Sequence, residues 1–297
     1  MDKKRRLFSG SGVALVTPFT KENTIDNAAL KDQAAFHMRE GTDALIVCGT
    51  TGEVSTLSPS ERAEATAAVV EAANGRLPVV SGVGGNDTRA VIAACRAAEN
   101  AGADAVLAVT PYYNKTTQAG LVAHYEAVAD ASGLPVILYN VPSRTGLNMR
   151  AETAAKLAAH VNIIATKEAS GDIAQIADIA RLCGDDLDIY AGNDTDVLAI
   201  LALGGAGVIS TAANIVPAQM RRLCAAFFDG RLDEARAIQL QLMPLIHALF
   251  AEVNPIPVKE AMALMGFPVG ALRLPLVPMS AANREALKAC MHEMGLI

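Results

Sequence analysis

The chain has 297 residues, a length that fits one large domain or one large domain with a small appendage. Hydrophobic residues make up 52% and charged residues 19%, which excludes a disordered protein, because disordered chains combine low hydrophobicity with high net charge. The formal charge of −6 argues against a nucleic-acid-binding protein, which typically has a basic surface. Aromatic residues are only 4%, so aliphatic side chains must fill the core, as in helices packed on buried parallel strands.

The amino-terminal residues and the cysteines bear on the cellular compartment. Residues 1–6 are mostly charged, as at the start of a signal peptide, but residues 7–12 lack the apolar run that secretion requires. The five cysteines are an odd number, lie far apart and form no CxxC pair, which argues against a disulfide framework and a zinc site. We therefore expect a cytoplasmic protein with reduced thiols.

Eight short apolar runs recur along the chain. Each is continuous rather than alternating, which is typical of strands that are buried on both faces of a sheet. The runs are Gly12–Pro18, Ala44–Gly49, Pro78–Gly84, Ala105–Pro111, Pro135–Asn140, Ile163–Glu168, Leu187–Gly192 and Gly207–Thr211.

Helical segments, with apolar residues three or four positions apart, separate these runs. Asn27–Glu40 and Thr88–Ala101 show this spacing. Ser58 has the features of a helix N-cap, because Pro59 follows it and Glu61 lies three residues further on. Glycine is expected to end four helices, at Gly41, Gly75, Gly102 and Gly133.

The regular alternation of strand and helix predicts the fold class, α/β, and within it a (β/α)8 TIM barrel. A doubly wound sheet is the alternative, but it usually has a glycine-rich loop after its first strand. Here the first strand ends Val16–Phe19 without such a loop, and Gly82–Gly85 after the third strand is only a weak glycine signal. We expect a barrel domain over residues 1–218 and a C-terminal helical domain over residues 219–297.

The segment Val197–Met220 carries no charge and is long enough to suggest a membrane-spanning helix. Glycines, Asn214 and Pro217 interrupt it, however. A short helix, a glycine turn and a buried strand explain the segment better, so we predict a protein that does not enter the membrane.

Polar residues at the ends of the strands are the candidates for chemistry, since barrel active sites lie at that rim. Lys167, at the end of a buried strand, could form a Schiff base with a carbonyl, because burial favours the neutral amine. It could equally reach solvent or pair with Glu168. Tyr139 could relay protons or be an ordinary core residue. Arg144 could bind a carboxylate or be a solvated loop residue.

Two further strand ends are rich in hydroxyl groups. Gly49–Glu53 offers two threonine hydroxyls between glycines, which would let backbone amides approach a carboxylate, although a plain glycine turn also fits. Thr110–Asn114 contributes two adjacent phenols.

Taken together, these motifs show a strong resemblance to a known family. Their order and content are similar to those of the 4-hydroxy-tetrahydrodipicolinate synthases, members of the pyruvate-dependent class I aldolase family that also includes N-acetylneuraminate lyase. The matching segments are Gly49–Glu53, Thr110–Asn114, Tyr139–Gly146, Thr166–Ser170, Ala191–Asp194 and Asn254–Lys259.

The resemblance implies a condensation of pyruvate with L-aspartate 4-semialdehyde, the first committed step of the diaminopimelate and lysine pathway. Lys167 would form an imine with pyruvate, and the derived enamine would attack the aldehyde. Tyr139 would relay protons together with Thr51 and with Tyr113. The resemblance further implies four substrate contacts besides Thr51: the pyruvate carboxylate on Thr50, the semialdehyde carboxylate on Arg144, and backbone groups of Gly192 and Ile209.

The family also implies an assembly and a cofactor requirement. Tyr113 would enter the site of a neighbouring subunit, which implies at least a dimer and usually a homotetramer built from two dimers. The Schiff base itself supplies the electron sink, so no cofactor is expected. No metal is expected either, because the five histidines are scattered along the sequence.

Two alternatives share most of these residues. A related aldolase that cleaves a sugar-derived keto acid would need the same lysine, but sialic acid lyases usually lack an arginine at the place of Arg144. A non-catalytic barrel that kept the pyruvate pocket would need a broken proton relay. Finally, Val54–Arg62 contains no histidine and Ala90 stands where lysine-inhibited relatives have an acidic residue. We therefore predict weak or absent inhibition by lysine.

Overall fold

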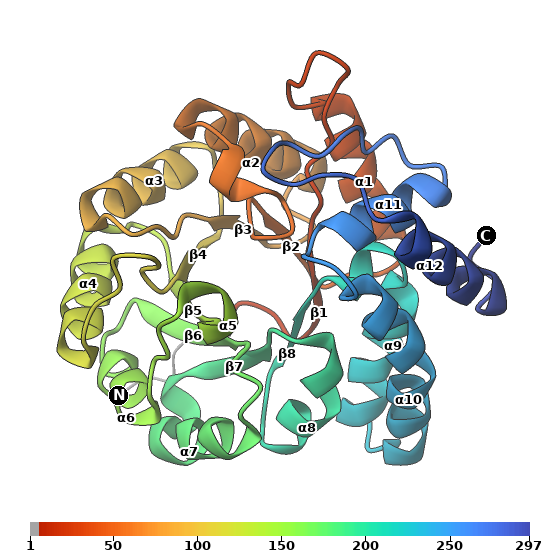
Figure 1. Cartoon of the computed structure of the whole chain (residues 1–297). Coiled ribbons are helices and arrows are strands. Elements are labelled where there is room, and N and C mark those ends of the chain that lie inside the picture. Colours follow the sequence, from red (N-terminus) through yellow and green to blue (C-terminus); the bar gives the residue numbers. More distant parts are fainter. Residues whose placement is uncertain (1–5) are drawn as a thin grey trace.

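The computed structural model describes residues 6–297, and it contains a closed barrel of parallel strands with helices outside it (Figure 1). Each strand pairs with the next one along the chain, and the last pairs with the first, which closes the sheet. The predicted (β/α)8 barrel is therefore confirmed. The strands are β1 Gly10–Ala14, β2 Ala44–Val47, β3 Val79–Gly82, β4 Ala105–Val109, β5 Val136–Asn140, β6 Ile163–Glu168, β7 Asp188–Ala191 and β8 Gly207–Ser210.

Each of the eight predicted runs overlaps a strand, and the largest difference is at the first. β1 begins at Gly10 and ends at Ala14, so it starts and stops earlier than the apolar run predicts. The remaining residues of that run belong to the loop at the rim, where the Leu15 amide still donates to the Ile46 carbonyl oxygen at 2.9 Å. Hydropathy did not distinguish strand from rim here because both are buried.

Helices cover the outside of the barrel, and three more follow it at one side, next to α9 and α1 (Figure 1). The surrounding helices are α1 Asn27–Arg39, α2 Pro59–Ala73, α3 Thr88–Asn100, α4 Gln118–Ala131, α5 Pro142–Thr145, α6 Ala151–Ala158, α7 Ile173–Cys183, α8 Val197–Ala202 and α9 Pro217–Phe228. The C-terminal helices are α10 Leu232–Leu249, α11 Ile256–Leu264 and α12 Ala281–Glu293, and short 3-10 turns are η1 Val54–Thr56, η2 Gly184–Asp186, η3 Asp194–Asp196 and η4 Ala212–Asn214.

The C-terminal helices confirm the expected appendage. α10 packs against α9, and α12 packs against both α10 and α11. α9 itself contacts β1 and spans the expected boundary between residues 218 and 219, and the division into two domains at that point stays a prediction. The uncharged segment folds as α8, a turn and β8, as expected, and none of the helices in residues 6–297 is long and apolar enough to cross a membrane.

Helix ends follow the sequence signals with one exception. The Ser58 hydroxyl accepts from the Glu61 amide at 3.2 Å, and the Glu61 carboxylate accepts from the Ser58 amide at 2.8 Å, which completes the predicted capping box. Gly133 does not end α4 through a left-handed conformation. α4 ends at Ala131, and the backbone of Ser132 is extended. The Ser132 hydroxyl donates to the Leu134 carbonyl oxygen at 2.8 Å and accepts from the Leu134 amide at 3.1 Å. A Cβ at Gly133 would lie 2.1 Å from a Glu99 carboxylate oxygen, which the exposed Glu99 side chain could relieve by moving.

The core has two parts, one between barrel and helices and one inside the barrel. Inside the barrel, near the amino-terminal ends of the strands, the rings of Phe8 and Tyr190 stack with their centres 4.3 Å apart. The Tyr190 hydroxyl donates to the Phe8 carbonyl oxygen at 2.7 Å. The segment before β1 thus packs into the end of the barrel opposite to the rim that carries the candidate residues.

Candidate active site

Lys167 and Tyr139 lie side by side at the carboxyl-terminal end of the barrel. They are register partners on β6 and β5, and the Lys167 Nζ lies 4.5 Å from the centre of the Tyr139 ring. Both side chains are buried, at 6% and 7% exposure. Tyr139 belongs to the cluster inside the barrel, so the two residues face the interior together. A phenol and an amine in this arrangement can exchange protons with a bound carbonyl compound.

The structure also decides between the alternatives for Lys167. At 6% exposure its side chain does not reach solvent. Successive strand residues point to opposite faces, so the side chain of Glu168 lies on the outer side of the sheet. Its carboxylate accepts from Asn140 and Ser170, and no ion pair joins it to Lys167 within residues 6–297. The expected alternatives of a solvated or Glu168-paired lysine are therefore wrong.

The threonine motif follows β2 and folds into a tight turn. The Gly52 amide donates to the Gly49 carbonyl oxygen at 3.0 Å, and Glu53 adopts a left-handed conformation with φ of 56°. This turn leaves Thr50 half-buried and Thr51 almost fully buried. A small cavity of about 30 Å³ lies beside it, and both Thr50 and Tyr139 line this cavity.

The hydroxyl of Thr51 has two polar neighbours. It lies 3.3 Å from the Thr211 hydroxyl at the end of β8, and it accepts from the Asn254 side-chain amide at 3.0 Å. Because the NH2 group of Asn254 can only donate, this bond does not use the hydroxyl proton of Thr51. The backbone oxygen of Asn254 in turn accepts from the exposed Arg144 guanidinium at 3.3 Å. One residue of the C-terminal region therefore connects the predicted relay to the predicted carboxylate-binding arginine.

A buried ion pair fixes this connection. The Lys259 Nζ on α11 lies 2.7 Å from a Glu53 carboxylate oxygen, and both side chains are almost completely buried. Lys259 also donates to the Ala271 carbonyl oxygen at 2.8 Å and lies 4.3 Å above the centre of the Phe19 ring. Burial lowers the pKa of the Lys259 ammonium, and the charge of Glu53 opposes that shift. The pair holds the turn after β2 against the C-terminal helices.

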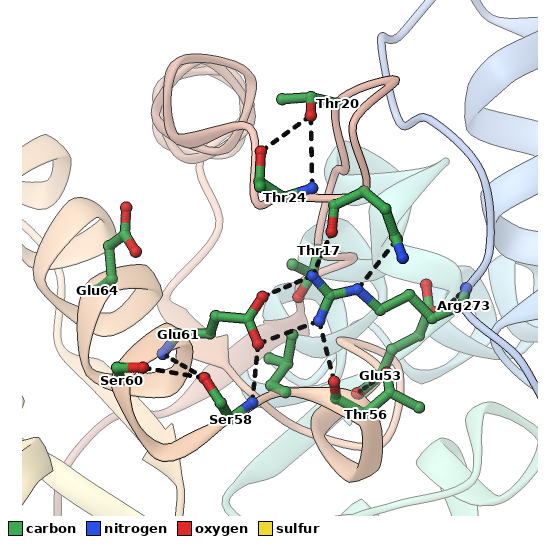
Figure 2. A network of polar contacts seen from close by, with 12 residues as sticks. Thr17, Thr20, Thr24, Glu53, Thr56, Ser58, Ser60, Glu61, Glu64 and Arg273 are labelled. Carbon is green, nitrogen blue, oxygen red and sulfur yellow. Dashed lines mark hydrogen bonds and ion pairs between the residues drawn. The ribbon is translucent and has the colours of Figure 1, made fainter.

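Arg273 extends this attachment toward α2 (Figure 2). Its backbone amide donates to the second Glu53 oxygen at 2.9 Å, and its guanidinium lies 2.5 Å from a Glu61 carboxylate oxygen. The hydrogen bond from Arg273 lowers the pKa of the Glu61 carboxyl to about 2. The guanidinium also donates to the Thr56 carbonyl oxygen at 2.9 Å. The segment around Arg273 is thus joined to residues 53–61, far earlier in the sequence, beside the predicted site.

Tyr113 is placed differently from the other predicted residues. Its side chain is 91% exposed, and its backbone is left-handed with φ of 68°. The neighbouring Tyr112 is 37% exposed, so neither phenol of this motif is buried within the chain. The structure does not bring Tyr113 into contact with Tyr139 or Thr51 through any hydrogen bond found among residues 6–297.

Gly192 and Ile209, the two predicted backbone contributors, lie at the ends of β7 and β8. The Gly192 amide donates to the Glu168 carbonyl oxygen at 2.7 Å, so that amide is already engaged in the protein. Ile209 is fully buried and belongs to the cluster inside the barrel. Nearby, a carboxylate oxygen of Asp194 accepts from the Ala212 amide at 2.8 Å, which fixes the loop after β8. Burial raises the pKa of Asp194.

Three residues of this site had no role in the sequence analysis: Thr211, Asn254 and Lys259. Thr211 ends the eighth apolar run, so the rule that strand ends carry the chemistry would have included it. The other two stand in a helical segment far along the chain, and only the resemblance of the motif marked them. Among residues 6–297 no group of histidine, cysteine and acidic side chains could hold a metal ion. Four of the five cysteines are buried, and Cys290 is partly exposed.

Comparisons with known proteins identify the family of this chain. Residues 7–294 match the model of the dihydrodipicolinate synthetase family. The chain is 52% identical over 292 residues to the 4-hydroxy-tetrahydrodipicolinate synthase of Thermoanaerobacter sp. (strain X514), covering 98% of each protein.

Solved structures give the same result. The enzyme of Cyanidioschyzon merolae with lysine bound has a TM-score of 0.96 and 42% identity, with 99% of this chain and 100% of that chain covered. The chloride-inhibited dihydrodipicolinate synthase of Acinetobacter baumannii complexed with pyruvate has a TM-score of 0.95 and 40% identity, with 98% and 100% covered. The chain therefore belongs to the dihydrodipicolinate synthetase family and is an enzyme, a lyase with the TIM-barrel fold.

Proposed function

We propose that the protein condenses pyruvate with L-aspartate 4-semialdehyde to give 4-hydroxy-tetrahydrodipicolinate, in the cytoplasm and for lysine biosynthesis. The observation that carries this proposal is the buried Lys167 amine 4.5 Å from the ring of Tyr139. The names of the relatives and the pyruvate complex of the Acinetobacter baumannii enzyme support it.

The reaction follows from these groups. The Lys167 amine adds to the keto carbon of pyruvate and water leaves, which gives an imine. Loss of a proton from the methyl carbon gives an enamine, and this carbon forms the new bond to the aldehyde carbon of the second substrate. The amine of the second substrate then attacks the imine carbon, which closes the ring and releases Lys167. Tyr139 and Thr51 carry the protons in these steps, and the Schiff base supplies the electron sink without a cofactor.

The remaining residues bind the two carboxylates. Thr50 and Thr51 offer hydroxyls and backbone amides for the pyruvate carboxylate. Arg144 is exposed at the rim, and its guanidinium offers a planar pair of donors for the semialdehyde carboxylate. Gly192 and Ile209 contribute backbone groups around the bound substrates.

Borohydride reduction in the presence of pyruvate tests the imine. We expect a stable adduct on Lys167, found by peptide mass spectrometry, and no adduct in the Lys167→Ala variant. A wild-type protein that forms no adduct with pyruvate would be incompatible with the proposal. The Lys31→Ala variant, which lacks a lysine at the surface, serves as control and should form the adduct normally.

A coupled assay separates this function from cleavage of a sugar-derived keto acid. With Arg144→Ala we expect the KM for aspartate semialdehyde to rise about 10- to 100-fold, because charged hydrogen bonds to its carboxylate are lost. Formation of the pyruvate adduct should stay unchanged. Turnover of sialic acid by the wild type, with none of the semialdehyde, would favour the other aldolase activity.

We further propose a homotetramer built from two dimers, with Tyr113 serving the site of the neighbouring subunit. Its 91% exposure and left-handed backbone support this, since an exposed phenol held away from its own site can reach another. Mixed oligomers of the Tyr113→Phe and Lys167→Ala variants test it. Random pairing should restore about a quarter of the wild-type activity if Tyr113 acts across the interface. No recovery in oligomers that have exchanged subunits would show that Tyr113 serves its own subunit.

Weak or absent inhibition by lysine is also proposed. Residues Val54–Arg62 contain no histidine, and Ala90 carries no charge. The Cyanidioschyzon merolae relative does bind lysine, so the family fold itself does not decide the question. Titration of lysine into the assay is expected to leave activity unchanged at sub-millimolar concentrations, and strong inhibition there would contradict the proposal.

A further inference from the structure

The outer face of β5 and β6 carries a buried polar pair directly behind Tyr139 and Lys167. Asn140 and Glu168 are register partners, as are Tyr139 and Lys167 one residue earlier. Because side chains alternate along a strand, the first pair points away from the barrel interior and the second pair into it. Asn140 and Glu168 are both completely buried.

Hydrogen bonds join the two residues of the outer pair. The Asn140 side-chain amide donates to a Glu168 carboxylate oxygen at 3.2 Å, and the Ser170 hydroxyl donates to the same oxygen at 3.1 Å. The other Glu168 oxygen accepts from the Thr166 hydroxyl at 3.4 Å. The backbone continues the pairing, since the Ala169 amide donates to the Asn140 carbonyl oxygen at 2.9 Å. The carboxylate therefore bridges the last residues of both strands.

Asn140 also attaches the pair to the helical layer. Its side-chain amide donates to the Asn148 side-chain oxygen at 2.9 Å, and its oxygen accepts from the Met149 amide at 3.0 Å. Asn148 in turn donates to the Gln175 side chain on α7 at 2.7 Å. The side chain of Asn140 thus connects the end of β6 with the loop between α5 and α6, and Asn148 of that loop connects to α7.

The surroundings of Glu168 are uncharged. Its hydrogen-bond partners Asn140, Thr166 and Ser170 are neutral, and the titratable group that faces it from α4 is the phenol of Tyr125. The Tyr125 hydroxyl donates to the Ala108 carbonyl oxygen at 3.0 Å, and burial raises its pKa, so it is neutral at physiological pH. Burial likewise raises the pKa of the Glu168 carboxyl to about 7.

We propose that Glu168 and Asn140 are positioning residues that hold the Lys167 amine against the Tyr139 phenol, a role that rests on the proposed function of those two residues. Neither touches the substrates. They act by fixing the register of β5 and β6 at the point where both strands present a reacting side chain. A misplacement of about 1 Å can lower a rate about 100-fold, so such a device has a measurable effect.

The test compares Glu168→Ala and Asn140→Ala with a matched control. Ser81→Ala is suitable because Ser81 is also a buried strand residue, bonded to Thr66 on a helix at 2.9 Å but remote from Lys167. We expect the two test variants to form the borohydride-trapped pyruvate adduct about 10- to 100-fold more slowly than the control, with a similar loss in kcat. The KM for aspartate semialdehyde should remain unchanged, because Arg144 is not disturbed.

A second measurement covers variants that fail to fold. Glu168→Gln keeps the shape and the acceptor for Asn140 but cannot ionise. The ratio of wild-type to Glu168→Gln adduct formation should rise from about one at pH 6 to several-fold at pH 8, as the carboxyl ionises and accepts all its hydrogen bonds more strongly.

Two results would overturn the proposal: a ratio that stays constant from pH 6 to 8, or folded alanine variants that react as fast as Ser81→Ala. A wild type that forms no adduct at all refutes the function of Lys167 instead, so the two failures are distinguishable.

Discussion

Glu53, in the turn after β2, and Glu168, at the end of β6, are both buried, but their carboxylates have different partners. Glu53 is paired with the ammonium of Lys259 at 2.7 Å, and a backbone amide donates to its other oxygen. Glu168 has no cation beside it among the residues described, and only hydroxyls and an amide donate to it. The same side chain at the same depth is therefore stabilised by charge at one strand end and by neutral donors at the other.

The difference reflects what each glutamate connects. Glu53 joins the barrel to helices more than 200 residues later in the chain, and a strong ionic contact suits a junction between separate parts. Glu168 joins two neighbouring strands that already share a backbone ladder. The role proposed for Glu168 is to fix the relative position of these strands, and hydrogen bonds suit it because their energy depends on geometry. The contrast leads to three predictions.

The largest effect is expected from Lys259→Met. The substitution leaves the carboxylate of Glu53 buried without its cation, and breaking a buried pair in this way typically costs about 3–5 kcal/mol. Urea unfolding at pH 7 measures the free energy of unfolding. The double variant Glu53→Gln with Lys259→Met should recover most of the loss, because it removes both charges together. An equal loss in both variants would show that packing rather than charge dominates there.

A smaller effect of opposite sign is expected from Glu168→Gln. The pKa of Glu168 is raised from its ordinary value of 4.5 to about 7, which corresponds to about 3 kcal/mol at most. Below pH 4.5 the carboxyl is protonated in both folded and unfolded chains, so the variant and the wild type should be equally stable. As the pH rises to 7 the unfolded chain loses this proton first, so the wild type loses stability and the variant does not.

Unfolding free energies at pH 4.5, 6 and 8 check this. We expect the Glu168→Gln variant to be more stable than the wild type at pH 8, with the gap closing toward pH 4.5. A gap that is independent of pH would mean that the carboxyl is not perturbed as described. A variant that is more stable yet slower would also support the positioning role of Glu168.

The smallest effect is expected from Arg273→Ala. Its guanidinium lies 4.2 Å from the Phe19 ring centre and binds Glu61 and backbone oxygens at a partly exposed position. We expect a loss of about 1–2 kcal/mol at pH 7. Because the pKa of Glu61 is lowered to about 2, this contribution is present above pH 4.5 and is lost as the pH falls toward 2. Thermal unfolding at pH 7 and pH 3 should therefore show a smaller difference at pH 3.

The sequence allowed the barrel to be predicted because its strands are buried on both faces. The run Ala105–Val109, for example, is apolar throughout, as is typical of a strand that is buried on both faces. Lys167 and Tyr139 were found by the same rule, since both interrupt or end such runs. Their proximity followed from the order of the strands, because consecutive parallel strands in a barrel are neighbours.

Contacts between distant segments could not be predicted in the same way. Asn254 donates to Thr51 across 203 positions, and no periodicity records such a pairing. The burial of Glu168 was also missed, because a charged residue at the end of an apolar strand is expected to face solvent. Only the three-dimensional packing of α7 and α4 over the strand ends shows that it is buried. For Tyr113 the resemblance predicted a role that the structure of one chain does not test. Its side chain is exposed, and its hydroxyl has no partner site within the described residues.

The stacked rings of Phe8 and Tyr190 determine from which end substrates can enter the barrel. They occupy the amino-terminal end of its interior, and the Tyr190 hydroxyl holds the chain segment before β1 in place. In the proposed reaction, pyruvate, the second substrate and the water released by imine formation must then enter and leave through the opposite rim. In that reaction pyruvate must form the imine with Lys167 before the second substrate can add to the enamine. Because water leaves through the same rim before the second substrate adds, a ping-pong kinetic scheme with pyruvate first is expected.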